Sequence, residues 1–224
     1  MTSDRPDGGV GPDLNVRFDY EWGTLAFGDL PDEPIAPLRE WLAEAGEHMG
    51  ADFNAMGLST VDTAGRPSSR NVLLRDVTDS GEFWFFTNRS SHKGNDIASN
   101  PQVCLLFSWL PLHRQVRVDG AAHELDDEAS DLYFAQRPRD SQIAAWASEQ
   151  SSTLGDRGEL EAAVDRFEER FEGAPVTRPG HWGGYAVTAR SIEFWQGRSS
   201  RLHDRIRFSR TEPAAAWTKE RLAP

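Results

Sequence analysis

Three residues near the C-terminus, Arg201, His203 and Arg205, have the types and spacing of an anion-binding group. Alternate residues on a β-strand share one face, so the three side chains are predicted to point the same way. Two guanidiniums beside an imidazole suit a phosphate, a carboxylate or an electron-rich ring. The alternative is an exposed strand face that carries solubilising charge. The composition favours a site, because residues 197–210 hold five arginines and a single acid, Asp204.

A second candidate is the series Tyr133, Arg137 and Ser141, which recurs every four residues. On one continuous helix these side chains would line a single face, although Pro138 is expected to interrupt it. A phenol, a guanidinium and a hydroxyl together supply the donors that a phosphate monoester needs. The alternative, an ordinary helix-turn-helix in which an arginine pairs with Asp140, is equally compatible with these residues.

A third candidate is the apolar strand pattern bracketed by Arg70 and Arg75. The two arginines differ in parity, so a regular strand would direct them to opposite faces. They could serve two different anions, or they could lie at the strand ends in water, which is the simpler interpretation.

Residues 87–93 combine the end of a strand with a hydroxyl-rich turn and Lys93 at the start of a predicted helix. Free N–H groups and the helix dipole favour phosphate at such a position. Capping by Ser90 or Ser91 is the ordinary alternative, and it is compatible with phosphate binding because both use the same geometry.

Other chemistries lack their patterns. No glycine motif of a P-loop or dinucleotide fold is present, and the histidines lack zinc-ligand spacing, so no metal site is predicted. Ser59, Ser141 and Ser151 lack the context of a nucleophile elbow. Four tryptophans are expected in the core, and any of them could also form the wall of a planar-ligand site. They are Trp109, Trp146, Trp182 and Trp195.

The chain has 224 residues, 38% hydrophobic content and a formal net charge of −12. The negative charge argues against nucleic-acid binding, and no apolar run is long enough to span a membrane. The polar residues 1–16 are predicted to be a disordered N-terminal segment without the features of a signal peptide. The single cysteine, Cys104, fits a reducing cytoplasm.

Hydrophobic periodicity predicts a helix over 35–49, helices after residue 126, and strands before and after them. The C-terminal strands need other strands to pair with, and the strands of the first half of the chain are available for this pairing. A single mainly-β, α+β domain over residues 17–224, built on a closed antiparallel barrel with flanking helices, is therefore predicted. The expected strands are 55–61, 69–77, 82–87, 102–109, 114–119, 182–188, 192–196, 202–209 and 217–222, and the expected helices are 35–49, 91–99, 127–136, 140–148 and 158–171.

These motifs together resemble the pyridoxamine/pyridoxine 5'-phosphate oxidases, a family of FMN enzymes. The resemblance is strongest over 137–152 (RPRDSQIAAWASEQSS), 192–197 (IEFWQG) and 201–205 (RLHDR). It implies an FMN-binding split β-barrel and a homodimer with FMN between the subunits. It also implies oxidation of pyridoxine or pyridoxamine 5'-phosphate to pyridoxal 5'-phosphate, with dioxygen as the acceptor and hydrogen peroxide as a product.

The resemblance also implies roles for individual residues, with Arg201 and His203 placed over the substrate ring as the catalytic pair. The implied substrate contacts are Arg17, Tyr20, Arg75, Tyr133, Arg137, Ser141, Arg201, Leu202 and His203. The implied FMN contacts are Arg70, Asn71, Val72, Leu73, Leu74, Arg75, Phe86, Thr87, His92, Lys93, Gln115, Gln150, Ser151, Trp195 and Arg205.

Three positions depart from the usual family pattern: Arg75 stands for lysine, His92 for arginine and Phe86 for tyrosine. Arg75 keeps open a family oxidase that acts on another aromatic, as in phenazine biosynthesis, although that substrate would not need the phosphate donors. A non-catalytic flavin-binding barrel is a further alternative. It would need no substrate-facing Arg201 and His203.

Overall fold

The computed structural model describes Tyr20 and residues 23–224. The predicted disordered segment 1–16 and the proposed substrate contact Arg17 lie outside the described residues. Among the described helices, none is long and apolar enough to cross a membrane.

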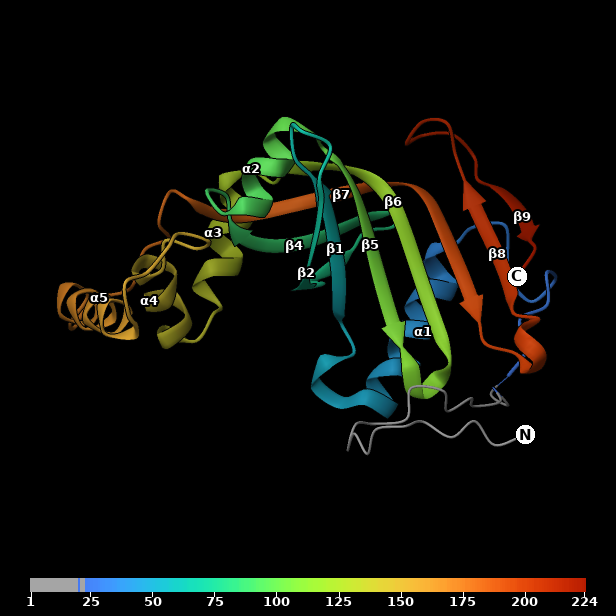
Figure 1. Ribbon diagram of the computed structural model, residues 1–224, viewed down its shortest axis with the longest axis horizontal. Coiled ribbons are helices and arrows are strands. Elements are labelled where there is room, and N and C mark those ends of the chain that lie inside the picture. Colours follow the sequence, from blue (N-terminus) through green and yellow to red (C-terminus); the bar gives the residue numbers. More distant parts are fainter. Residues whose placement is uncertain (1–19, 21–22) are drawn as a thin grey trace, which may run out of the picture.

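In the described part of the chain, nine antiparallel strands form one strongly curled sheet (Figure 1). The strand order is β2-β1-β5-β6-β7-β4-β3, and β8 pairs with β7 and β9. The strands are β1 (Ala55–Val61), β2 (Pro67–Leu73), β3 (Asp76–Val77), β4 (Glu82–Asn88), β5 (Gln102–Trp109), β6 (Arg114–Glu124), β7 (Trp182–Gln196), β8 (Asp204–Ser209) and β9 (Thr218–Leu222).

Strand β7 connects the two halves of the sheet. Its first half pairs with β4 and its second half with β8, while β6 runs beside almost its whole length. The register of β6 shifts between Asp119 and Gly120. A Cβ on Gly120 would lie 2.4 Å from the carbonyl oxygen of Thr188, so this close approach of two strands requires glycine.

The interior of the curled sheet holds the main hydrophobic core. Strand β1 alternates as expected, with Met56 and Leu58 buried, and β4 contributes the fully buried Phe83 and Phe85. Helix α1 (Ile35–Met49) covers this core with a buried stripe that includes Leu38. Burying each such side chain contributes roughly 1.5–3 kcal/mol, which holds the helix on the sheet.

Helices α3 (Asp127–Ala135), α4 (Arg139–Ala147) and α5 (Arg157–Arg170) project to one side of the sheet (Figure 1). They enclose a second, smaller cluster made of Phe134, Ile143, Phe171, Val176 and Trp182. Helix α2 (His92–Ser99) lies over the end of the sheet next to them, and short 3₁₀ turns occupy Gly50–Asp52, Leu110–Leu112 and Ser199–Arg201.

Most predicted elements are confirmed, and the helix over 35–49 and the strands over 55–61 and 102–109 have the expected bounds. Four predictions are wrong in detail, the first being that the strand over 114–119 continues to Glu124. The strand over 69–77 breaks at residues 74–75, the strands over 182–188 and 192–196 are one strand, and the strand over 202–209 begins at Asp204. The barrel is also not closed by pairing, because the described ladder ends at β2 on one side and β3 on the other.

Candidate functional site

A cavity of about 420 Å³ opens where the helices meet the sheet. Its walls come from the end of β2, from β4, from α2, from the α3–α4 junction, from residues 148–150 and from the start of β7. The lining residues are Asn71, Val72, Leu73, Arg75, Phe86, Thr87, Asn88, Lys93, Tyr133, Arg137, Ala144, Ala145, Ser148, Gln150 and Trp182.

The charge of this lining is entirely positive among the described residues. Arg75, Lys93 and Arg137 contribute cations, and no lining residue is acidic. Burial lowers the pKa of Arg137, and nearby Arg75 lowers it further, although Tyr133 raises it. The Nη1 atom of Arg137 is buried and has no hydrogen-bond partner. A partly buried guanidinium with an unused buried donor costs free energy unless an anion accepts from it.

Three nearly parallel aromatic rings form one wall of the cavity. The rings of Phe86 and Tyr133 stack with centroids 4.0 Å apart, and the ring of Trp182 lies 5.6 Å from that of Phe86. The guanidinium of Arg75 stands 5.5 Å from the Tyr133 ring and that of Arg137 stands 4.7 Å from the Trp182 ring. These contacts hold both guanidiniums at the wall without neutralising their charge.

Lys93 provides the third cation at the start of α2. Its ammonium donates to Gln150 Oε1 at 2.6 Å, to Ser91 Oγ at 3.1 Å and to Thr87 Oγ1 at 3.2 Å. Burial and, to a smaller extent, the charge of Arg70 lower its pKa to about 8. Ser91 caps the helix by accepting from the Gly94 N–H, so capping and a nearby cation occur together.

Only some of the other FMN contacts predicted in and just after strand β2 line the cavity. Asn71, Val72 and Leu73 line the cavity, whereas Leu74 is buried in the core. Arg70 lies behind the lining, where its Nη1 donates to Thr60 Oγ1 of β1 at 2.7 Å and its Nη2 stands 3.8 Å from Asp96 Oδ2 of α2. The two arginines therefore have different surroundings, and the simpler interpretation that both lie at strand ends in water is wrong for Arg70, whose side chain is mostly buried and hydrogen-bonded.

A polar hollow of about 500 Å³ adjoins the first cavity and shares Asn88 and Gln150 with it. His92 and Ser151, both predicted FMN contacts, line this hollow. Ser151 has a positive φ of 77°, a strained value for a residue with a side chain. Ser141 lies in helix α4 and lines neither cavity, because α3 and α4 are separate helices rather than one continuous face.

A second cluster of predicted site residues lies on the other half of the sheet. Strand register places Gln115, Trp195 and Arg205 in one row across β6, β7 and β8. The rings of His203 and Trp195 have centroids 4.5 Å apart, and Tyr20 stands edge-on to both, at 5.6 Å and 6.1 Å.

His113 and Gly197 form the seat of Tyr20 in this cluster. The ring of His113 lies 4.5 Å from that of Tyr20 in an edge-on arrangement. A Cβ on Gly197 would lie 3.0 Å from the Tyr20 ring and 3.0 Å from the His113 Cβ. Neither His113 nor Gly197 was among the predicted contacts, because only the fold brings them next to Tyr20.

The expectation that Arg201, His203 and Arg205 alternate on one strand is wrong. Only Arg205 lies in β8, while Arg201 ends the 3₁₀ turn and His203 precedes the strand. Ser200 and Arg201 both have positive φ, 55° and 60°, so a left-handed turn determines where Arg201 lies. Arg201 and Leu202 are exposed.

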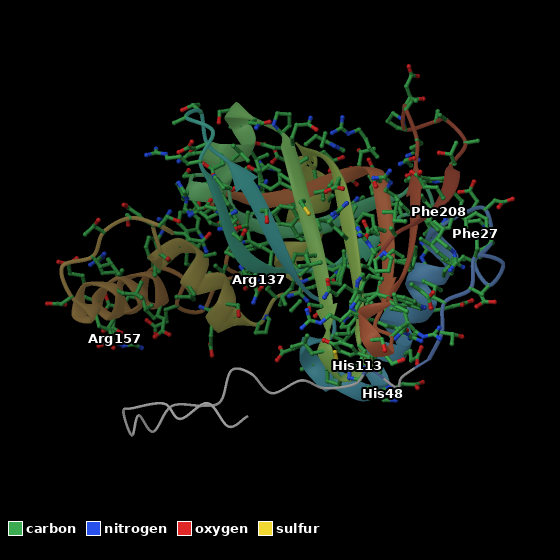
Figure 2. The ribbon with its side chains drawn as sticks, turned by 45° about the vertical axis from the view of Figure 1, so that its right-hand side comes forward. Phe27, His48, His113, Arg137, Arg157 and Phe208 are labelled. Carbon is green, nitrogen blue, oxygen red and sulfur yellow. The ribbon has the colours of Figure 1, made fainter. Side chains whose placement is uncertain are left out.

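The two clusters do not meet within one chain. Trp182 at the start of β7 lines the cavity, and Trp195 near the end of the same strand belongs to the second cluster, roughly 40 Å away along the strand. Figure 2 shows the same separation, with Arg137 on the side of helices α3–α5 and His113 near His48, at the end of α1. The implied substrate and FMN contacts are therefore split between two half-sites.

The fold and cavity together define an α+β protein with a curled antiparallel sheet and a cationic, aromatic-walled site that suits a planar anionic ligand. Residues 42–171 match the family model described as pyridoxamine 5'-phosphate oxidase, and residues 182–224 match the one described as pyridoxine 5'-phosphate oxidase C-terminal dimerisation region. The chain belongs to the pyridoxamine 5'-phosphate oxidase family, which confirms the resemblance, the fold class and the enzyme class predicted from the sequence.

Relatives named pyridoxine/pyridoxamine 5'-phosphate oxidase include proteins from Chromohalobacter salexigens, 47% identical, and Nocardioides sp., 49% identical. The first alignment covers 94% of this chain and 97% of the relative, and the second covers 93% and 96%. Among solved structures, PhzG from Burkholderia lata in complex with tetrahydrophenazine-1-carboxylic acid is 29% identical with a TM-score of 0.84. That alignment covers 92% of this chain and 100% of PhzG.

Proposed function

We propose that this protein is an FMN-dependent oxidase that converts pyridoxine 5'-phosphate, pyridoxamine 5'-phosphate or both to pyridoxal 5'-phosphate. Dioxygen would be the electron acceptor and hydrogen peroxide a product. The observation that carries the proposal is the buried, unpartnered Nη1 of Arg137 in a cavity whose described lining has cations and no acid. Relatives that align with nearly the whole chain and bear this enzyme's name support the same substrate class.

The cations of the cavity fall into two groups that fit two phosphates. Lys93, Thr87 and Gln150 form a compact hydrogen-bonded cluster near Arg70, and we assign this group, with His92 and Ser151 in the adjoining hollow, to the phosphate of FMN. Arg75, Tyr133 and Arg137 lie at the aromatic wall, and we assign them to the substrate phosphate. The donor set fits FMN because it offers a buried ammonium next to space for a planar ring.

The second cluster would complete the site from a second copy of the chain. A twofold axis repeats each surface, so a homodimer can bring the cavity of one protomer to the second cluster of the other. The match of residues 182–224 to a dimerisation region supports this arrangement. The row Gln115, Trp195 and Arg205 would then contact FMN. We also propose that residues 17–224 form a single domain.

FMN, when bound, would supply the redox chemistry, accepting a hydride equivalent and passing electrons to dioxygen. The protein's part is orientation and charge. Arg201 and His203 would hold the substrate ring, and Arg17 and Tyr20 would cover it. The ring contacts of Tyr20 with Trp195 and His203 suit such a cover.

A family oxidase of the phenazine type is the second candidate, because PhzG shares the fold at a TM-score of 0.84. The named oxidases are 47–49% identical to this chain, whereas PhzG is 29% identical. A phosphate-free substrate would also leave Arg137 without an anion. A non-catalytic flavin-binding barrel would leave Arg201 and His203 without a ligand.

The test begins with the visible spectrum of the purified protein, in which we expect bound flavin. Under anaerobic conditions, pyridoxine or pyridoxamine 5'-phosphate should bleach the flavin, and air should restore its colour with release of peroxide. A protein that binds no FMN would contradict the main proposal. A flavin that stays oxidised with both compounds would favour the other two candidates.

The shared site has its own test. Arg137→Ala and Arg201→Ala each alter a different half-site, so with substrate well below KM each homodimer should keep at most about a tenth of wild-type activity. Random mixing gives mixed dimers with one intact site each, so roughly a quarter of wild-type activity should return. A lack of recovery in demonstrated mixed dimers would contradict a site built from two protomers.

We also propose a cytoplasmic location. The single cysteine, Cys104, has no second cysteine in the sequence with which to form an intramolecular disulfide, and this fits a reducing compartment.

A further inference from the structure

Asp96 is a buried carboxylate behind the proposed flavin-phosphate group. It lies on helix α2, one turn after Lys93, and is 4% exposed. Its Oδ2 accepts hydrogen bonds from Thr60 Oγ1 of β1 at 2.6 Å and from Ser68 Oγ of β2 at 3.3 Å. A buried carboxylate needs such donors and usually a cation as well.

The cation is Arg70, which reaches the same carboxylate oxygen through both hydroxyls. Its Nη1 donates to Thr60 Oγ1 at 2.7 Å and its Nη2 donates to Ser68 Oγ. Each hydroxyl thus accepts a hydrogen bond from Arg70 and donates its own single proton to Asp96. The direct separation between Arg70 Nη2 and Asp96 Oδ2 is 3.8 Å. Two bridges to one oxygen fix the plane of the guanidinium.

The ionisable groups that the structure places within 4 Å of the Asp96 carboxylate are basic. Arg70 faces it from β2, and His92 of α2 places Nε2 3.8 Å from its Oδ1, although the His92 side chain is 60% exposed. Burial lowers the pKa of Arg70, and Asp96 opposes that shift. Arg70 in turn lowers the pKa of Lys93. The carboxylate of Asp96 therefore offsets part of the cost of burying Arg70, the cation that stands near Lys93.

We propose that Asp96 is a positioning residue for the flavin phosphate, acting through Arg70 and, by charge, through Lys93. It orients the Arg70 guanidinium through Thr60 and Ser68, and its negative charge favours the placement of Arg70 near Lys93. This inference rests on the proposed function, because it assigns the phosphate of FMN to this group. Asp96 itself does not line the cavity and has no contact with the ligand.

A purely structural role is the competing explanation, since Asp96 also ties α2 to β1 and β2. The two roles differ in what they do to ligands with and without phosphate. Riboflavin has the same ring system as FMN and no phosphate. A loss confined to FMN indicates positioning of the phosphate cations, whereas an equal loss for both flavins indicates a general disturbance of the site.

The experiment titrates the flavin-free, full-length protein with FMN and with riboflavin from pH 6 to pH 9, following flavin fluorescence. For Asp96→Asn we expect FMN affinity to fall on the order of tenfold to a hundredfold, the range of one hydrogen bond to a charged group, with riboflavin affinity little changed. The decline of FMN affinity at high pH should also move to lower pH, because loss of the carboxylate makes the cations easier to deprotonate.

Matched variants complete the design. Asp96→Glu keeps the charge and should recover part of the FMN affinity. Asp79→Asn removes an equivalent charge from a side chain that is 92% exposed, and it should bind both flavins like the wild type. If Asp96→Asn does not fold, Thr60→Val and Ser68→Ala remove the bridges singly and should weaken FMN more than riboflavin.

Two failures are distinguishable. A wild-type protein that binds FMN no better than riboflavin contradicts the proposed function itself. A wild type that prefers FMN, with Asp96→Asn or the bridge variants retaining that preference and its pH profile, overturns only the role of Asp96.

Discussion

The backbone N–H of Arg198 donates a hydrogen bond to Nδ1 of His203 across 3.1 Å. A nitrogen that accepts cannot carry a proton, so the neutral ring of His203 is the tautomer with hydrogen on Nε2. Burial lowers the pKa of His203, and Arg201 lowers it further. The turn at residues 198–203 therefore presents His203 as a neutral donor beside Trp195, not as a base at Nδ1.

The first prediction concerns the pH dependence that follows from this bond. A lowered pKa means that His203 stays neutral as the pH falls through its ordinary value near 6.5 and gains its proton only below it. The kcat/KM of the oxidase should accordingly show no loss assigned to His203 above pH 6.5. If kcat/KM declines as the pH falls, with a midpoint above pH 6.5, and this decline disappears in His203→Gln, the assigned tautomer is contradicted. The glutamine retains a donor and does not titrate.

The second prediction concerns Lys93. Its pKa of about 8 in the ligand-free protein means that it is protonated at pH 7 and increasingly neutral above pH 8. FMN affinity should therefore be constant between pH 6.5 and 7.5 and decline above pH 8, where binding must first restore the proton. In Lys93→Met the affinity should be lower throughout, and this decline should be absent. Fluorescence titration measures both, and a Lys93→Met protein with wild-type pH dependence would count against the assignment.

The third prediction separates the substrate phosphate from the flavin. Arg137 stands over Trp182 with an unused buried donor, so Arg137→Ala should raise KM for the phosphorylated substrate roughly tenfold to a hundredfold. The Kd for FMN should stay within a fewfold of the wild type. Arg137→Lys should recover only part of the loss, because an ammonium lacks the planar fork that stacks on Trp182. Steady-state kinetics on FMN-saturated protein would measure the change, and an unaltered KM would refute the role of Arg137.

The fourth prediction concerns the seat of Tyr20. The Cβ introduced by Gly197→Ala would lie 3.0 Å from both the Tyr20 ring and the His113 Cβ, an overpacking of about 1–3 kcal/mol that shifts of Tyr20 and His113 must relieve. We expect a higher KM, because Tyr20 is displaced, and a lower thermal midpoint. Tyr20→Ala in the same background should have no further effect on KM, since the contact is already lost. A strictly additive double variant would show that Gly197 does not act through Tyr20.

Local patterns were sufficient for most elements of this protein. The buried stripe of helix α1 and the alternation of β1 depend on residues that are neighbours in the sequence, so their period predicts the structure directly. The combination of Ser91 and Lys93 at the start of α2 was likewise visible, because a helix cap involves only a few consecutive residues.

Patterns failed where long-range contacts decide. Arg201 and His203 match strand alternation in sequence, but the turn at Ser200 and Arg201 takes left-handed backbone angles that no local rule for these residue types would favour. The break at residues 74–75 similarly follows from pairing, since the Asn54 carbonyl accepts from Leu74 while the Trp84 carbonyl accepts from Arg75.

The sequence by itself determined which side chains could bind phosphate and aromatic rings, and which stretches are helices or strands. Only the tertiary structure decided that Arg137 and Lys93 share one cavity while Trp195 and His203 lie far along β7, and that Arg70 faces Asp96. The physical reason is that residue type and period act over a few residues. The grouping of charges, in contrast, depends on strand register and on how far the sheet curls between distant segments.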